Sequence, residues 1–310
     1  MYLAAVLLLI HCQLINSEDD LYVVKPVVAG AAGGWIPEVN NFKWTVGVHK
    51  RNDEGIFEHI CGASLISTQL VLSAAHCFWN DGKDIPLDQY RLSAGNFYRE
   101  LNADSNSQKM EIKKVIFHER YRDYNLNYAH DIVIIQLAQE VLLTDLISPI
   151  MIDWSPYFED NDLRGQFGTV VGWGFTELDE PSVTRIAVVL PFVDFDECYE
   201  VVPHEFHSFL TADKFCAGLR NGTAVCPGDS GGGLAFFNAT RNQWYLRGIV
   251  SVGVRPKGKS KCYKTQYSAF TSISHYRTWL QQKLRELHNP SRITDRYHRP
   301  PTREDALIFV

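Results

Sequence analysis

Three absences in the 310-residue sequence narrow the classes of protein that it encodes. No apolar run reaches the about 18 residues that a membrane-spanning helix needs, so we expect no membrane span. Lysine and arginine number 30 against 36 acidic residues, a formal net charge of −6, so we expect no general binding to nucleic acid. No two cysteines have CxxC spacing, which leaves a zinc site as the weaker interpretation of the cysteines.

The N-terminus carries one short apolar run, 3–10, followed by polar and small residues and an acidic cluster at 18–20. This order is typical of a secretory signal peptide, which we place at 1–17 although no basic residue precedes the run. The alternative is a buried N-terminal strand or helix. A signal peptide predicts a secreted, extracellular protein.

The cysteine count agrees with secretion. Of seven cysteines, Cys12 lies within the predicted signal peptide, which leaves six. An even number predicts three disulfides formed in an oxidising compartment, and spacing alone does not choose the pairs. Two sequons, at Asn221 and Asn238, predict glycosylation, whereas proline excludes the one at Asn289.

Most of the chain predicts short strands separated by turns that contain glycine, asparagine, aspartate or proline. The clearest apolar or alternating runs are 45–49, 63–66, 71–73, 132–137, 186–190 and 244–252. This pattern favours an all-β sandwich or barrel. Helical spacing predicts one helix at 274–287 with Ser274 as its N-cap, and a flexible tail at 289–310.

Three segments carry residues suited to nucleophilic catalysis. Ser230 lies in the run Cys-Pro-Gly-Asp-Ser-Gly-Gly-Gly, where glycines allow backbone N–H groups of Gly228 and Ser230 to stabilise an oxyanion. His76 precedes a cysteine at the end of a strand, and Asp131 opens an apolar run that would bury it against a partner. Each segment alone also fits a structural role, as a glycine-rich turn, a structural histidine and a turn aspartate.

The order His76, Asp131, Ser230 resembles the chymotrypsin family of serine proteases, over about residues 27–288. The runs Val-Gly-Trp-Gly at 171–174 and Phe-Cys-Ala-Gly at 215–218, with Ser251, also match that family. The resemblance implies two packed antiparallel six-stranded β-barrels with a C-terminal helix. It also implies three disulfides, Cys61 with Cys77, Cys198 with Cys216 and Cys226 with Cys262.

The same resemblance implies a mechanism: Ser230 as nucleophile, His76 as general base and Asp131 as the carboxylate that orients it. We expect no cofactor and no metal. Calcium in particular is not expected, because Asn96 stands where a calcium ligand carboxylate would be.

The primary pocket departs from trypsin-like members, because Ala224 stands where they have an aspartate. With Val225, Gly253 and Ser268 lining the pocket beside Ser251, the resemblance predicts cleavage after an apolar residue. Val252 replaces a tryptophan that usually lines the neighbouring subsites.

Activation by cleavage would make Val27 a new N-terminus that pairs with Asp229, which defines 18–26 as a short propeptide. Pro26 precedes Val27, so a trypsin-like activator is not expected. The loop after Gly253 carries four cations, which either contact an acidic substrate or sulfated glycan or are simply solvated: Arg255, Lys257, Lys259 and Lys261.

We therefore expect a secreted serine endopeptidase. The stretches 222–234 and 242–251 resemble the protease domain of insect modular, cascade-initiating proteases. This resemblance implies a protein substrate, and another zymogen is one candidate. We also expect protein protease inhibitors as partners and a monomeric state. The alternatives are a digestive chymotrypsin-like enzyme and a catalytically silent homologue that acts as a binding or cofactor protein.

Overall fold

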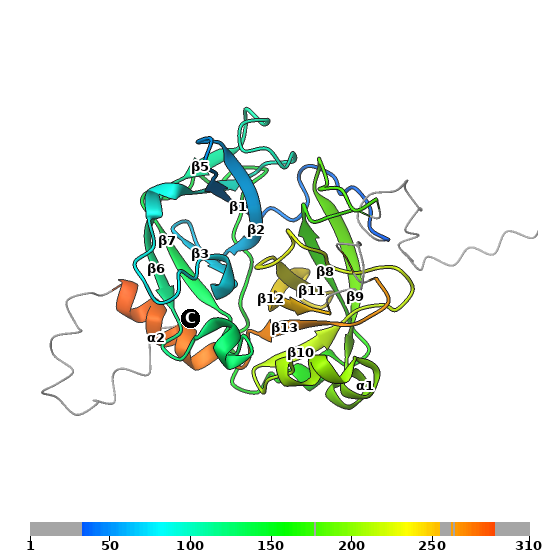
Figure 1. The fold of residues 1–310 in the computed structure, drawn as a ribbon. Helices are drawn as coiled ribbons and strands as arrows, with labels where there is room; N and C mark the ends of the chain where they lie inside the picture. Colours follow the sequence, from blue (N-terminus) through cyan, green and yellow to red (C-terminus); the bar gives the residue numbers. More distant parts are fainter. Residues whose placement is uncertain (1–32, 177, 255–261, 263, 289–310) are drawn as a thin grey trace, which may run out of the picture.

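The computed structural model describes residues 33–176, 178–254, 262 and 264–288. The segments 1–17, 18–26 and 289–310, Val27 and the cations at 255–261 lie outside the described residues. The described chain folds into two antiparallel sheets that lie side by side (Figure 1). One short helix accompanies the second sheet, and the C-terminal helix packs against the first.

The first sheet has the strand order β5-β4-β1-β2-β3-β7-β6. Its strands are β1 (Thr45–Arg51), β2 (Phe57–Leu65), β3 (Leu70–Ser73), β4 (Tyr90–Ala94), β5 (Gln108–Met110), β6 (Ile112–Phe117) and β7 (Val133–Leu137). Its two edge strands, β5 and β6, are separated in the chain only by Glu111. Seven strands are counted here where the resemblance implies six, because one bent segment forms both edges of this barrel-like sheet and is divided at Glu111.

The second sheet is a closed barrel of six strands in the order β10-β13-β12-β11-β8-β9. These are β8 (Phe167–Gly172), β9 (Ile186–Val193), β10 (Lys214–Ala217), β11 (Gly233–Asn238), β12 (Gln243–Gly253) and β13 (Ser268–Ser272). The all-β expectation is confirmed, and the two barrel-like antiparallel sheets with a C-terminal helix match the expected architecture.

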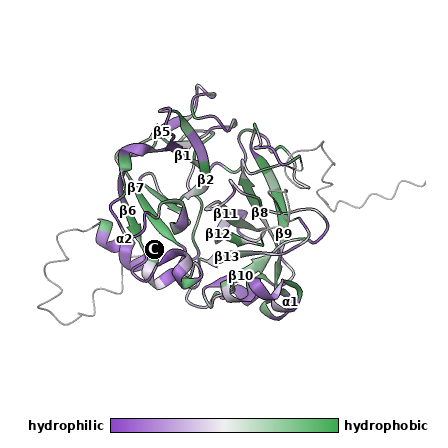
Figure 2. Cartoon of the chain, in the orientation of Figure 1, coloured by the Kyte–Doolittle hydropathy of each residue, from purple (hydrophilic) through white to green (hydrophobic). Residues whose placement is uncertain are grey.

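Hydrophobic residues gather on the strands of both sheets, whereas α1 and α2 carry many polar ones (Figure 2). The larger core cluster lies in the first sheet and extends to Tyr276 and Leu280 at the C-terminal helix. A second cluster fills the six-stranded barrel around Phe215, Leu234 and Phe270. Burial of these apolar faces is the main favourable term in folding.

Two helices adjoin the sheets. α2 spans Arg277–His288, so the helix begins three residues later than 274. Ser274 is not the N-cap, because that position falls on Tyr276; the Ser274 hydroxyl donates instead to Asp160 Oδ1 at 2.8 Å. α1 (Phe195–Val201) was not expected, and its one buried residue, Cys198, forms a disulfide with Cys216 on β10.

Candidate active site

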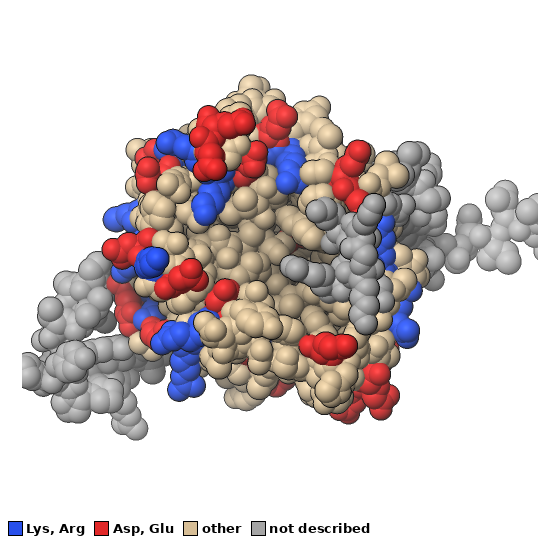
Figure 3. All heavy atoms as spheres, in the orientation of Figure 1, with Lys and Arg blue, Asp and Glu red and all other residues tan. Residues whose placement is uncertain are grey.

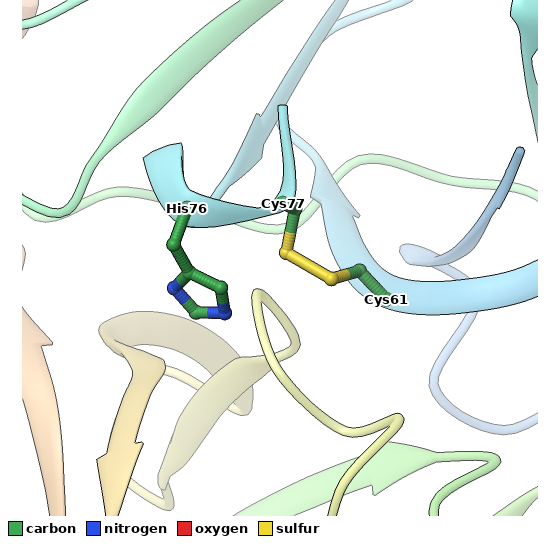
Figure 4. A group of neighbouring side chains, drawn as sticks. All are labelled: Cys61, His76 and Cys77. Atoms are coloured by element: carbon green, nitrogen blue, oxygen red, sulfur yellow. A yellow bond between two sulfur atoms is a disulfide. The ribbon is translucent and has the colours of Figure 1, made fainter. Parts of the chain in front are cut away.

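His76 lies on a single 3-10 turn, Ala75–Cys77, that directly follows β3. The next residue, Cys77, forms a disulfide with Cys61 of β2, which ties this turn to the first sheet. Figure 4 shows the imidazole and the disulfide leaving the turn on the same side. The disulfide also explains why these three neighbouring side chains do not form a metal site, since both sulfurs are bonded to each other.

Asp131 is completely buried just before β7 and accepts three hydrogen bonds. The backbone N–H of His76 donates to Oδ1 at 2.9 Å, and its Nδ1 lies 2.8 Å from Oδ2. Ser251, on β12 of the other sheet, donates its hydroxyl to Oδ2 at 2.6 Å. The carboxylate therefore joins the two sheets and fixes the orientation of the imidazole.

This pairing controls the charges of both groups. Burial raises the pKa of Asp131, but the His76 charge and the hydrogen bonds from His76 and Ser251 outweigh it and lower that pKa. Burial likewise lowers the pKa of His76, and the adjacent Asp131 carboxylate reverses the effect and raises it. The arrangement keeps Asp131 ionised and makes the imidazole a stronger base.

Ser230 lies in a turn with two positions that only glycine can occupy, one on each side of the serine. Gly228 and Gly231 have φ of 98° and 78°, and a Cβ on Gly231 would overlap the Gly62 carbonyl and the Ser73 hydroxyl. The carbonyl of Ser230 accepts the Gly62 N–H at 2.7 Å. This bond joins the serine turn to β2.

The structure brings His76 and Asp131 into direct contact, but within the described part of the chain no hydrogen bond joins Ser230 to His76. Its backbone lies beside the histidine turn, since Cys77 Sγ is 3.8 Å from the Ser230 carbonyl oxygen. Catalytic hydrogen bonds are often long in proteins without substrate and tighten only in the complex.

Asp229, which precedes the serine, is buried and points away from solvent. Its Oδ1 accepts the N–H of Gly174 and its Oδ2 accepts the N–H of Cys226, both at 2.9 Å. Burial raises its pKa to about 6, against the opposing effect of these bonds and of Arg99. A Cβ on Gly172 or Gly174 would overlap this carboxylate, which explains the two glycines.

The predicted pocket residues lie in the second barrel. Ala224 is buried in a small cluster with Phe175 and the Cys226–Cys262 disulfide, and Val225 packs against the barrel core. Gly253 pairs with Ser268 across β12 and β13. Ser251 differs from the other four, because its hydroxyl is used by Asp131.

The face shown in Figure 3 is hollowed in its middle, where mostly uncharged side chains lie, and charged ones gather around it.

A polar network that was not predicted from the sequence holds His130, the residue before Asp131. His130, with φ of 62°, donates its N–H to Asp213 Oδ2 at 2.9 Å, and its Nδ1 lies 2.7 Å from the Tyr276 hydroxyl. Tyr276 donates to Asp213 at 2.7 Å. No local signal identifies this network, because its members are 63 to 146 residues apart.

Comparisons with known proteins now identify the family. The Trypsin family model matches residues 32–280. The chain belongs to the trypsin family of serine endopeptidases. The expectation of a chymotrypsin-family enzyme is thus confirmed.

Several curated relatives are arthropod proteases. The chain is 29% identical over 263 residues to the CLIP domain-containing serine protease HP8 of Bombyx mori, covering 82% of this chain and 69% of that protein. It is 31% identical over 253 residues to Limulus clotting factor C of Carcinoscorpius rotundicauda, covering 79% of this chain but 24% of that protein. It is 29% identical to Serine protease ea of Drosophila melanogaster, covering 81% of this chain and 67% of that protein.

Another relative is named a transmembrane protease, serine 11G of Rattus norvegicus, at 29% identity over 273 residues, covering 87% of this chain and 59% of that protein. In the part of this chain that the structure describes, no helix is long and apolar enough to cross a membrane.

Proposed function

We propose that this trypsin-family protein hydrolyses peptide bonds with Ser230 as nucleophile, His76 as general base and Asp131 as the orienting carboxylate. The observation that carries the proposal is the buried Asp131 carboxylate, which accepts both the backbone N–H and the imidazole of His76. With Nδ1 donating to Asp131, Nε2 is left as the acceptor for a proton.

In this mechanism Ser230 Oγ attacks the substrate carbonyl carbon while its proton moves to His76 Nε2. Negative charge develops on the carbonyl oxygen and is stabilised by the backbone N–H groups of Gly228 and Ser230. The C–N bond then breaks, the leaving amine takes the proton from His76, and water releases the acyl group by the reverse sequence.

For specificity we infer an apolar residue before the cleaved bond. Ala224 and Val225 offer no charge to a lysine or arginine, and a buried cation without a partner is costly. Gly253 and Ser268 are a paired position of β12 and β13, and both have small side chains, which suits the wall of a pocket.

For biology we infer a secreted protease of an extracellular proteolytic cascade that acts on protein substrates and is controlled by protein inhibitors. The similarity to proteases named for clotting and for CLIP domains supports this inference. The sequon residues Asn221 and Asn238 are both exposed, as glycosylation requires. Activation would free Val27 to pair with the buried Asp229.

Hydrolysis of a peptide library by the secreted protein, before and after cleavage that frees Val27, tests the proposal. We expect cuts after apolar residues by the wild type and none by Ser230→Ala. Equal hydrolysis by both proteins would contradict the assignment of the nucleophile. A protein that stays inactive with Val27 free would instead be a silent homologue.

A further inference from the structure

Asp229 is a buried carboxylate held by neutral groups. Its two hydrogen bonds come from the backbone N–H groups of Gly174 and Cys226. Among the described residues, it makes no ion pair within 4.0 Å. A buried carboxylate that stays ionised needs positive charge nearby, so the surroundings of Asp229 have to supply it.

Arg99, in the loop between β4 and β5, supplies that charge. It follows β4, and its guanidinium donates from Nη1 to the carbonyl of Trp173 at 2.8 Å. The same peptide group carries the N–H of Gly174, which donates to Asp229 Oδ1 at 2.9 Å. One peptide group therefore lies between the cation and the carboxylate, accepting from the first and donating to the second.

This geometry strengthens both hydrogen bonds. A cation at the carbonyl oxygen withdraws electron density from the peptide, which makes its N–H a better donor to the carboxylate. The link runs from the loop between β4 and β5, where Arg99 lies, to the segment after β8 of the second barrel. Its length is fixed by the planarity of the peptide.

A second hydrogen bond from Arg99 reaches the serine turn by another route. Nη2 donates to the carbonyl of His59 on β2 at 3.1 Å, and Nε2 of His59 lies 3.0 Å from the carbonyl of Gly228. Both routes end at the turn that contains the N–H groups of Gly228 and Ser230.

The two histidines of this cluster carry no charge at neutral pH, and the remaining charged neighbour of Arg99 is the carboxylate of Glu58. Burial lowers the pKa of His59 to about 3 and also lowers the pKa of His49, whose Nε2 lies 3.1 Å from the Arg99 carbonyl. Arg99 is therefore the cation that acts on Asp229 among the described groups of the cluster.

We propose that Arg99 is a positioning residue for the oxyanion turn, stabilising ionised Asp229 through the Trp173–Gly174 peptide while holding Gly228 through His59. The proposal deepens the proposed function and rests on it for its consequence in catalysis. It does not require a free Val27, so Arg99 supports the turn in the uncleaved chain as well.

The direct test is an NMR titration of the Asp229 carboxyl carbon in the full-length Ser230→Ala protein, which needs no enzyme activity. Arg99→Gln should raise the pKa of Asp229 by about one unit, as expected for a unit charge at this range. Arg99→Lys keeps the positive charge and should therefore raise the pKa of Asp229 by less than Arg99→Gln does. Arg91→Gln is the matched control, because Arg91 pairs with Glu111 on the first sheet. An unchanged Asp229 pKa in Arg99→Gln would overturn the proposal.

The consequence for the turn is tested by the labelling rate of a fluorophosphonate probe in the uncleaved Ser230 protein, because a free Val27 would itself pair with Asp229 and mask the effect of Arg99. With a shift of one unit, the ionised fraction of Asp229 in Arg99→Gln falls about fivefold at pH 6 and hardly at pH 8. The labelling rate relative to wild type should fall in the same way. An equal loss at both pH values would show a merely structural role and contradict the proposal. Absence of labelling in the wild type with Val27 free would instead contradict the proposed function, and the titration would still decide the role of Arg99.

Discussion

At the scale of single residues, Asp131 shows how a carboxylate remains ionised without contact to water. Its hydrogen bonds come from the backbone and imidazole of His76 and from the hydroxyl of Ser251. Its backbone carbonyl in turn accepts the hydroxyl of Thr271 at 3.0 Å. Because these donors come from both sheets, the position of His76 depends on how the sheets pack together.

The pH dependence of hydrolysis follows from the His76 pKa. Catalysis needs neutral imidazole, and its pKa in the folded protein is raised above the ordinary 6.5. We therefore expect kcat/KM for a peptide substrate to rise with pH through a midpoint above 6.5, and a midpoint well below it would contradict the pairing.

Asp131→Asn should lower kcat by on the order of 10⁴-fold, because the imidazole loses its orienting acceptor. Asp123→Asn is the control, since Asp123 acts on His76 only through its charge and should have a small effect.

The primary pocket gives a second prediction at this scale. Ala224→Asp should create binding of benzamidine, a cationic aromatic probe, and shift cleavage toward lysine and arginine, because the new carboxylate offers a partner for the cation. Calorimetry with benzamidine and the peptide library measure the two effects. Ala224→Ser, which adds no charge, is the control. Benzamidine binding to the wild type at equal strength would contradict the uncharged pocket.

At the scale of elements, the turn that leads into the C-terminal helix contributes to the site through Tyr276, the residue before the helix. Its hydroxyl lies between Asp213 and the imidazole of His130, the residue before Asp131. Tyr276→Phe removes this hydroxyl and leaves Asp213 with one donor fewer. We expect unfolding by urea to show a loss of about 1–3 kcal/mol, typical of a hydrogen bond to a charged group. Tyr199→Phe, at an exposed position of α1, should cost little; equal losses in the two variants would contradict the role of Tyr276.

The sequence predicts long apolar elements better than short or bent ones. The runs at 45–49 and 132–137 fall on β1 and β7, whose side chains are largely buried. α1 was missed because seven residues with one buried position carry no helical periodicity. Ser274 was wrongly expected to cap α2, because the helix begins only at Arg277 and the Ser274 hydroxyl donates to Asp160, 114 residues away. The Arg99 link was missed for the same reason, since it depends on a carbonyl 74 residues away.

At the scale of the whole molecule, the interface between the sheets holds histidines that must stay neutral. Burial lowers the pKa of His59 to about 3, whereas the unfolded chain returns it to about 6.5. Between these values the unfolded state binds one more proton, so the free energy of unfolding falls as pH falls from 6.5 toward 3. The fold is therefore expected to be sensitive to acid.

Replacing His59 tests this origin of acid sensitivity. His59→Gln keeps a donor for the Gly228 carbonyl and does not titrate. Urea unfolding between pH 4.5 and 5.5 should show a pH slope smaller by about 1.4 kcal/mol per pH unit than in the wild type. His204→Gln, at an exposed position, should leave the slope near that of the wild type. A slope unchanged in His59→Gln would show that other groups cause the acid sensitivity.

The most direct test of the central claim, that Ser230 is the nucleophile activated by His76 and Asp131, is the mass of the intact protein after reaction with a fluorophosphonate. We predict one covalent adduct per chain, located on Ser230 by peptide mapping, formed by the wild type with Val27 free and not by Ser230→Ala or His76→Ala. No adduct in the wild type, or an adduct on another residue, would contradict the account.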